Sequence, residues 1–421
     1  MHRTSTLLTS LLLALATPHL AAAQTETQST ASTAAAPQPP PESPPTAPGS
    51  FKIPGTSTTL RFYGFVELHA IYDFAGRVDS VEAYDWSSVI PFQPLDGSAE
   101  AREKGRLYLT ARTSRIGLDS RTPSPLGEVY ARLEGDFNGV NLNQGETFTN
   151  SVLFRLNHAY VTIGSLLVGQ TSSLTSENSA SPDTVDWNGP GTQNFVRQPQ
   201  VRLTFDLGGG ITLAASAENA HNLGSGHVPD LTAQLAASGK WGKITLGAVT
   251  NEYRYDDDSS TPRAGALRGY GGLLTGAFNI GNDTLVLTAI GGQGIGRYLF
   301  NSVNQFVGTD AGGTLKGWRV VGYHAGYTHR WTDQLRSNLI FSQTFFDRNG
   351  IVIPDGPVAD DEAAGTFAAN RRLDQAFVNT FWHFLPNAEA GVEYEFGRRE
   401  TFDKQLGRES RVTAVLHYDF L

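Results

Sequence analysis

Arginine is the residue type with the clearest capacity for chemistry in this 421-residue chain, since arginine supplies 26 of its 32 basic residues. A guanidinium group binds a carboxylate, sulfonate or phosphate through two parallel hydrogen bonds. Six arginines in the first half of the chain fall on the polar side of segments that alternate polar and apolar residues: Arg61, Arg106, Arg112, Arg132, Arg155 and Arg202. Such a set indicates recognition of anionic groups.

Patterns for catalysis or metal binding are not found in the sequence. The absence of cysteine excludes disulfides, thiolate metal sites and cysteine nucleophiles. The ten histidines form no His-x-x-x-His pair, and there is no Gly-x-Ser-x-Gly motif. We therefore predict no catalytic residue, no cofactor and no metal. The formal net charge of −9 argues against a nucleic-acid partner.

The first fifty residues have the composition of an exported leader and a tether. Residues 1–23 combine a short basic start, an apolar stretch over 7–16 and the small residues Ala21–Ala23, which together predict a signal peptide. Residues 24–50 are rich in Ala, Thr, Ser, Gln and Pro and predict a disordered tether. The remaining chain has no run of about 18 apolar residues. Two classes remain, a secreted all-β protein and a transmembrane β-barrel.

Segments of about ten residues with alternating character fill the rest of the chain. In 127–137, Gly, Val, Ala, Leu and Phe occupy the odd-numbered positions, whereas four charged residues and a tyrosine occupy the even-numbered ones. Segments 59–73, 200–206 and 388–396 repeat this pattern. One wet face and one apolar face are typical of a transmembrane β-strand.

The connections between these segments alternate in length. Short ones include 164–165 and 280–283, and long ones include 74–104 and 171–197. Turns at one end and loops at the other are the arrangement of outer-membrane barrels. We therefore predict an all-β fold, a transmembrane antiparallel up-and-down β-barrel over 51–421. We count about sixteen strands, with 18 as the alternative, which leaves a lumen wide enough for water.

A series of short motifs follows in order along 51–421. They are Phe51-Lys52-Ile53-Pro54-Gly55-Thr56, Ala70-Ile71-Tyr72-Asp73-Phe74, Ser114-Arg115-Ile116-Gly117, Glu134-Gly135-Asp136-Phe137, His158-Ala159-Tyr160, Val168-Gly169-Gln170-Thr171, Asn188-Gly189-Pro190, Arg197-Gln198-Pro199-Gln200-Val201-Arg202, Gly391-Val392-Glu393-Tyr394 and Gly397-Arg398-Arg399-Glu400. In these motifs the chain resembles the DcaP-like family of trimeric outer-membrane porins of Gram-negative bacteria.

The resemblance implies a channel whose third long loop, 171–197, folds inward and narrows the lumen. The ionisable residues of this loop are Glu177, Asp183, Asp186 and Arg197. Together with the six wall arginines they are the predicted constriction, where a basic wall opposite acidic loop groups would orient dipolar solutes. The resemblance further implies an outer-membrane location, a homotrimer, contact with the lipid bilayer and lipopolysaccharide, and insertion by the barrel assembly machinery through the last strand.

The predicted function is a porin for passive diffusion of small hydrophilic solutes, favouring anionic, carboxylate-bearing compounds. Four alternatives stay open. The channel could be a general diffusion porin, or the arginines could pair with Glu67, Glu128, Glu134 and Asp136 inside the wall. The chain could instead be an outer-membrane barrel enzyme, which would need a Ser–His pair that no spacing identifies, or a secreted all-β binding protein.

Overall fold

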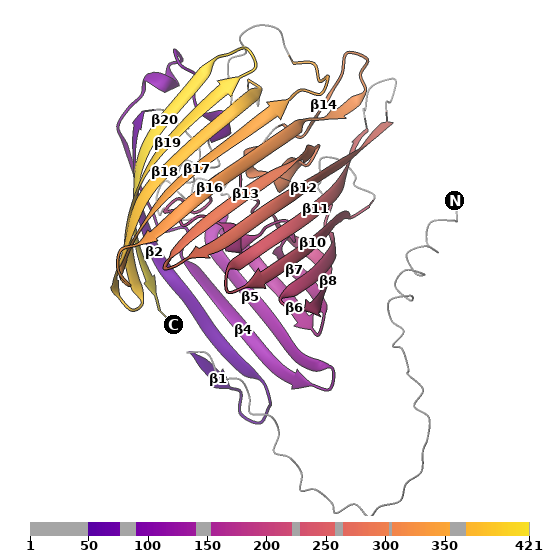
Figure 1. Cartoon of the computed structure of the whole chain (residues 1–421), viewed down its shortest axis with the longest axis vertical. Coiled ribbons are helices and arrows are strands. Elements are labelled where there is room, and N and C mark those ends of the chain that lie inside the picture. The colour runs from indigo at the N-terminus through magenta and orange to yellow at the C-terminus, as the bar shows by residue number, and fades with distance from the viewer. Residues whose placement is uncertain are drawn as a thin grey trace, which may run out of the picture. The chain divides into compact units, whose positions relative to one another are not determined.

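The computed structural model describes residues 49–75, 90–139, 153–220, 228–256, 264–302, 305–353 and 368–420. The predicted signal peptide and nearly all of the predicted tether lie outside these residues. Long antiparallel strands form one sheet that closes on itself into a barrel (Figure 1). Within the described ranges, no helix has the length and hydropathy needed to cross a membrane.

The barrel is built from consecutive strands that pair with their neighbours in the chain. In chain order these are β2 (Thr59–Ala75), β3 (Arg106–Thr110), β4 (Arg115–Ser124), β5 (Gly127–Gly139), β6 (Leu153–Ile163), β7 (Leu166–Ser172), β8 (Arg197–Gly208), β9 (Ile211–Glu218), β10 (Asp230–Gly239), β11 (Gly242–Asp256), β12 (Ala264–Ile280), β13 (Asp283–Gln293), β16 (Arg319–Arg330), β17 (Leu335–Asp347), β18 (Asn370–Leu385), β19 (Ala388–Thr401) and β20 (Leu406–Asp419).

The described strands make a barrel of 16, as the sequence predicts. Of the 18 strands in the sheet, β1 (Ser50–Lys52) pairs only with the start of β2. Strands β3 and β4 pair with successive parts of β2 and act as one interrupted strand. A separate hairpin of β14 (Val307–Thr309) and β15 (Leu315–Gly317) belongs to a loop. The short 3₁₀ turns are η1 (Ile90–Phe92), η2 (Glu100–Arg102), η3 (Asn178–Ala180), η4 (Gly296–Tyr298) and η5 (Phe300–Ser302).

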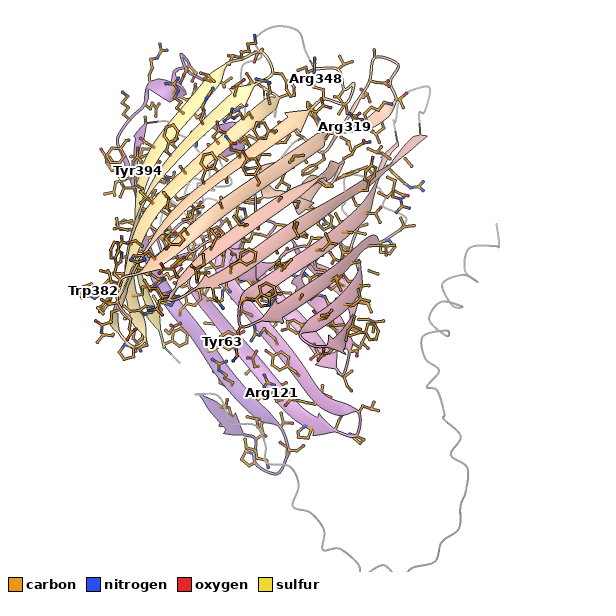
Figure 2. The ribbon with its side chains drawn as sticks, viewed as in Figure 1. Tyr63, Arg121, Arg319, Arg348, Trp382 and Tyr394 are labelled. Atoms are coloured by element: carbon orange, nitrogen blue, oxygen red, sulfur yellow. The ribbon has the colours of Figure 1, made fainter. Side chains whose placement is uncertain are left out.

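The two faces of the wall follow the alternation in the sequence, because successive side chains of a strand point to opposite sides. Outward positions carry exposed apolar residues, among them Val66, Leu68, Leu133, Val392 and Tyr394. The positions between them carry buried polar residues, among them Glu67, His69, Glu134 and Glu393. Exposed tryptophans lie at the end with the short turns, as Trp382 illustrates in Figure 2. This distribution suits a wall with hydrocarbon outside and water inside.

The first and last strands join edge to edge and close the sheet. Strand β2 pairs with β20 from Phe65 opposite Asp419 to Asp73 opposite Arg411. On the inner side, the buried Arg411 guanidinium donates two hydrogen bonds to Asp73, with an Nη2–Oδ2 distance of 3.1 Å. A buried ion pair of this geometry is specific, since a lone charge at either position would remain unsatisfied.

The third long loop, residues 173–196, lies inside the barrel, as the resemblance implies. At its base, the buried Glu218 carboxylate on β9 accepts hydrogen bonds from the Ser173 hydroxyl and the Leu174 amide. The far part of the loop reaches the opposite wall. The Asp186 amide donates to Glu393 on β19 at 2.7 Å, and the Gly191 amide donates to Gln375 on β18 at 3.0 Å. The loop is therefore tied to both sides of the lumen.

A second segment, residues 294–302, also folds inward and was not predicted from the sequence. Its Asn301 amide donates to the Gly191 carbonyl at 2.8 Å, and its Phe300 amide donates to the Gln193 carbonyl at 3.1 Å. The two inward segments are thus joined through their backbones. A buried apolar cluster fills the space between this segment and the wall; its members on β11–β18 are Val249, Leu273, Ile290, Val320, Ile340, Phe346, Leu373 and Phe377.

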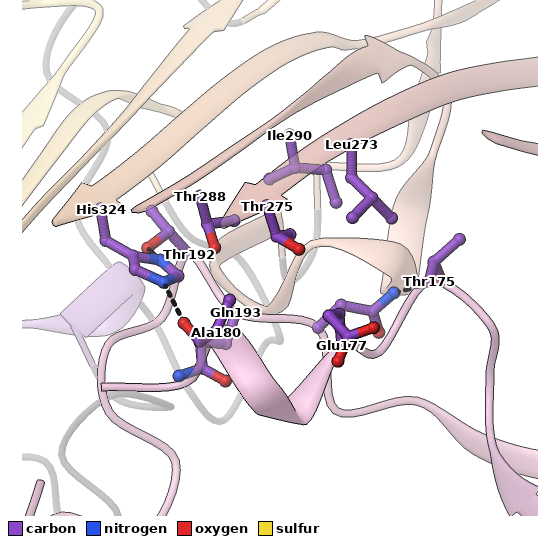
Figure 3. A pocket seen from close by; sticks show the side chains of 11 residues that line it. Thr175, Glu177, Ala180, Thr192, Gln193, Leu273, Thr275, Thr288, Ile290 and His324 are labelled. Carbon is purple, nitrogen blue, oxygen red and sulfur yellow. Dashed lines mark hydrogen bonds between the residues drawn. The ribbon is translucent and has the colours of Figure 1, made fainter. Parts of the chain in front are cut away.

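A small cavity remains where the loop meets the wall of β12, β13 and β16 (Figure 3). Its volume of about 20 Å³ suits roughly one water molecule. The buried His324 side chain closes one end, with Nδ1 2.8 Å from the Thr192 hydroxyl and Nε2 3.4 Å from the Ala180 carbonyl oxygen. Across the cavity, Glu177 bonds to Lys243 of β11 at 2.7 Å. Among the described residues, the loop therefore packs closely against this part of the wall.

We predict that Gly191→Ala loosens the contact between the two inward segments. A Cβ atom at position 191 would collide with Oδ1 of the buried Asn301, whose Nδ2 donates to Thr344 at 3.0 Å. Overpacking of this kind costs about 1–3 kcal/mol. The midpoint of heat-induced unfolding, followed by the shift in gel migration, should fall. In the double variant Gly191→Ala/Asn301→Ala the loss should be smaller than the sum of the single losses; strict additivity would contradict the assigned contact.

We also predict that acid weakens the attachment of the loop at Glu177. Burial alone would raise the pKa of this carboxyl group, but its hydrogen bonds to Lys243 and Ser179 hold the pKa below the ordinary value of about 4.5. A lowered pKa contributes stability above pH 4.5, and this contribution is lost as the pH falls through the folded-state value. Wild-type protein should therefore lose its advantage over Glu177→Gln between about pH 5 and pH 3. A difference in melting midpoint that stays constant over that range would refute the assignment.

Candidate constriction site

Five arginines line one continuous part of the inner wall, and we call them the arginine row. They are Arg61 on β2, Arg115 on β4, Arg132 on β5, Arg155 on β6 and Arg197 at the start of β8. Strands β2, β4, β5 and β6 are consecutive neighbours in the sheet, and β7 lies between β6 and β8. All five residues take part in polar or ring contacts on the lumen side. The row therefore follows the wall opposite the filled side of the lumen.

Three carboxylates lie behind the row. Arg132 donates to both oxygens of Asp119 at 2.8 and 3.1 Å, and the Arg61 guanidinium lies 3.9 Å from the same carboxylate. Arg155 donates to both oxygens of Asp136, at 3.0 and 2.8 Å. Two-point pairing fixes the plane of each guanidinium group while leaving its remaining N–H donors for other partners.

A third carboxylate and an amide complete this layer. Arg115 lies 2.8 Å from Glu134. Arg197 donates to the Oδ1 atom of the Asn157 side chain at 3.3 Å, and the Nδ2 atom of Asn157 in turn donates to Asp136 at 2.8 Å. The five guanidinium groups thus fall into three neighbouring sets, each built on one carboxylate: Asp119, Glu134 and Asp136.

Exposure differs sharply within these pairs. The side chains of Arg61, Arg132 and Arg155 are 29–34% exposed, whereas those of Asp119 and Asp136 are 7% and 0% exposed. The carboxylates are therefore covered by the guanidinium groups. At these positions the arginines, and not the carboxylates, form the exposed layer of the wall.

Aromatic rings separate the arginines along the wall. The Tyr63 ring lies 5.3 Å from both the Arg61 and the Arg132 guanidinium carbons. Trp187 of the inward loop lies 4.6 Å from Arg115, so the loop reaches the row at this point. Figure 2 places Tyr63 and Arg121 on the strands at the short-turn end of this wall. Cation–π contacts of this length hold the guanidinium planes in place.

The other predicted wall arginines lie outside the row. Arg202 donates to Gln200 at 3.0 Å and to the Ser172 carbonyl at the base of the loop. Arg112 is buried in the break between β3 and β4, 5.8 Å from the Tyr108 ring. Arg106 is exposed at the start of β3 and stands opposite Asp73 in the register. The structure thus brings together Arg61, Arg132 and Arg155 of the six.

The acidic residues of the loop face away from the row. Glu177 pairs with Lys243 on β11, and Asp183 pairs with Arg336 on β17. Asp186 is buried, with its backbone amide on Glu393. Among the predicted loop residues, Arg197 is the one that joins the row. The carboxylates of Glu177 and Asp183 and the backbone amide of Asp186 therefore anchor the loop to the wall away from the row.

The sequence analysis left open that wall carboxylates pair with the arginines. Three of these four carboxylates do pair with an arginine. Asp136 pairs with Arg155, Glu134 with Arg115 and Glu128 with Arg121. Glu67 bonds instead to His417 at 2.7 Å and to His69 at 3.3 Å.

Five contributors to the site were missed by the sequence analysis: Asp119, Asn157, Arg115, Tyr63 and Trp187. Arg115 shares the inward parity of Asp119 on the same strand, so the alternation could have identified it. Tyr63 stands two residues from Arg61 and shares its face. Trp187 belongs to an irregular loop, where no period predicts the direction of a side chain.

Comparisons with known proteins agree with this architecture. A family model described as DcaP outer membrane protein matches residues 46–420. The chain is similar to the crystal structure of the outer membrane channel DcaP of Acinetobacter baumannii, with 25% identity, a TM-score of 0.73, and coverage of 88% of this chain and 100% of that one.

More distant solved structures share the fold. The Salmonella typhi OmpF complex with daunomycin has 12% identity and a TM-score of 0.56, with 88% of this chain and 100% of that one covered. An anion-selective porin from Comamonas acidovorans has 12% identity and a TM-score of 0.52, with 86% and 100% covered. No curated protein sequence matches the chain.

The family match spans nearly all of the barrel, and the fold agrees with it over 16 strands and the inward loop. The family match and the fold both support a location in the outer membrane. The chain therefore belongs to the DcaP outer membrane protein family, and its fold is that of an outer-membrane porin channel.

Proposed function

We propose that small anionic, carboxylate-bearing solutes diffuse through this channel along the arginine row. The observation that carries the proposal is the layering of charge at the wall. Guanidinium groups about one-third exposed cover carboxylates that are nearly or fully buried. A passing ion therefore interacts at short range with the positive layer that faces the lumen. Charge close to the ion sets selectivity in a pore.

The balance of charge in the row supports the same direction. The row contains five arginines against the carboxylates of Asp119, Glu134 and Asp136. This local excess is positive although the whole chain has a net charge of −9. Interactions beyond about 8–10 Å are screened at physiological salt, so distant loop charges matter less than the row.

The position of the path follows from what fills the rest of the lumen. The far side holds the apolar cluster and the loop anchors, and residues such as Ile340, Leu373 and Phe377 are at most 1% exposed. The wall from β2 to β6 carries exposed guanidinium groups instead. Trp187 and Arg115 mark the point where the loop comes nearest to that wall.

General diffusion without charge preference is the main alternative, and it would require the row to be electrically neutral to a passing ion. The pairing of Arg132 with Asp119 and of Arg155 with Asp136 favours this alternative in part, because each carboxylate offsets the charge of its arginine. Anion preference is favoured because the arginine of each pair is more exposed to the lumen than its carboxylate.

The assembly and targeting of the chain are inferred more indirectly. OmpT, an outer membrane protein of Vibrio cholerae with a similar fold, has a solved trimer form, which supports a homotrimer. The sequence pattern of 1–23 supports export by a signal peptide, and the apolar outward face of β20 supports insertion by the barrel assembly machinery. In barrels of this class, the short turns face the periplasm and the long loops face the outside.

We predict that the wild-type channel is anion selective in a potassium chloride gradient across a planar bilayer, as judged from the reversal potential. Arg132→Gln should lower the permeability ratio of chloride to potassium about tenfold, since one unit charge about 6 Å from an ion contributes about 0.7 kcal/mol in water and acts with opposite sign on the two ions. Asp119→Asn should raise the same ratio, because it removes the negative charge beneath Arg61 and Arg132.

Arg319→Gln is the matched control, because Arg319 lies on the outward face of β16 at the long-loop end (Figure 2). It should leave the reversal potential unchanged. Cation selectivity of the wild type would rule out the proposal. Equal ratios in wild type, Arg132→Gln and Asp119→Asn would favour a general diffusion channel.

A further inference from the structure

Arg197 differs from the rest of the arginine row, because among the described residues it has no carboxylate partner. The guanidinium groups of the other four arginines lie 2.8–3.9 Å from a carboxylate of the wall. Within the described part of the chain, the one hydrogen-bond partner of the Arg197 side chain is the Oδ1 atom of Asn157, at 3.3 Å. The positive charge of Arg197 is therefore not offset by a direct partner.

The charges around Arg197 do not balance either. Arg155 and Arg115 repel its guanidinium group, which lies near both. The carboxylates of Asp136 and Glu134 attract it, but they already pair with Arg155 and Arg115. Three guanidinium groups thus stand against two carboxylates at this point of the wall. One positive charge is in excess, and it belongs to the residue without a carboxylate of its own.

The guanidinium group of Arg197 also keeps hydrogen-bond donors available. Such a group has five N–H donors, and the bond to Asn157 uses one of them. The Nε and Nη2 atoms have no partner in the described protein and are not enclosed by it, so they reach the solvent. Asn157 is fully buried and donates to Asp136 at 2.8 Å, so the group that orients Arg197 is itself fixed.

The backbone of Arg197 is held where the inward loop rejoins the wall. Arg197 stands opposite Ser172 in the pairing of β7 with β8. One residue inward, the Ser173 amide donates to the Val196 carbonyl at 2.8 Å. Because the side chain starts from a fixed point, less conformational freedom is lost when a ligand binds to it.

We propose that Arg197 binds one carboxylate of a passing solute directly, through two parallel N–H···O bonds. This inference rests on the proposed function, since it adds a binding residue to the path along the arginine row. Arg132 and Arg155 already use such a pair of donors on wall carboxylates, whereas the donors of Arg197 are open to a solute. The planar group matches a carboxylate and not a spherical halide, so Arg197 separates two anions of equal charge.

Two other ligands match the surroundings of Arg197 less well. A chloride ion would be attracted by the excess charge, but it has no second atom for the second donor. A doubly charged oxyanion such as sulfate would carry more negative charge than the single positive charge in excess. A carboxylate matches both the pair of donors and the charge.

The test compares single-channel conductance in potassium acetate and in potassium chloride over a range of concentrations. Conductance saturates as a binding site in a pore fills, so the wild type should saturate at a lower concentration of acetate than of chloride. Arg197→Lys keeps the charge and loses the planar pair of donors. It should raise the half-saturating concentration of acetate about tenfold. It should change the permeability ratio of chloride to potassium by less than about twofold, because a unit charge remains.

Arg319→Lys is the control, because Arg319 lies on the outward face of β16, and it should leave both quantities unchanged. The same half-saturating acetate concentration in wild type and Arg197→Lys would overturn the assignment, even in a channel that is anion selective. An equal loss for acetate and chloride would mean that charge alone acts, and would also overturn it. Saturation by sulfate at a lower concentration than by acetate would assign the donors to a doubly charged oxyanion instead.

A second measurement needs no variant and covers the case in which Arg197→Lys does not fold. Crystals of the wild-type protein grown with para-bromobenzoate should show the anomalous signal of bromine beside Arg197. A signal only elsewhere on the wall, or none, would overturn the assignment. The reversal potential in potassium chloride reports on the proposed function separately, so the failure of one is distinguishable from the failure of the other.

Discussion

Closure of the sheet is the constraint on which the rest of the structure depends. Hydrocarbon offers no partner to a backbone N–H or C=O group, so a sheet that crosses a membrane can have no free edge. Strand β2 therefore pairs with β20, and the Arg411–Asp73 ion pair lies on the inner side of that seam. Once the seam is fixed, the alternation of side chains assigns every residue of the wall to lipid or to the lumen.

The inner face divides into two halves of different character. From β11 to β18 the inward residues include the apolar cluster together with buried neutral polar residues such as Asn338, Ser342 and Gln375, and the two inward segments pack against them. From β2 to β6 the inward residues include arginines, carboxylates and tyrosines, and the arginines lie nearest the lumen. The inward loop links the halves, since Glu177, Asp183 and Asp186 bind the far wall while Trp187 contacts Arg115. Acidic loop residues thus serve as anchors, and in the proposed path the charge comes from the wall.

The sequence predicted the barrel well, because a period of two repeated along segments such as 127–137 leaves few other folds. It also predicted that Arg61, Arg132 and Arg155 share a face, which parity alone determines. It did not predict the partners of the loop acids, since Asp183 and Arg336 are 153 positions apart and no local pattern connects them. Nor did it predict the apolar filling near Ile340 and Phe377, because inward apolar residues break the rule that the lumen is polar.

The most direct test of this account asks which half of the lumen carries solutes. The native chain contains no cysteine, so single cysteines can be placed at will. Tyr63→Cys lies on the arginine wall, and Thr275→Cys lines the small cavity behind the loop. Modification by a negatively charged sulfonate reagent during single-channel recording should reduce the current of Tyr63→Cys and leave Thr275→Cys unaffected. Block at Thr275→Cys with none at Tyr63→Cys would contradict the account.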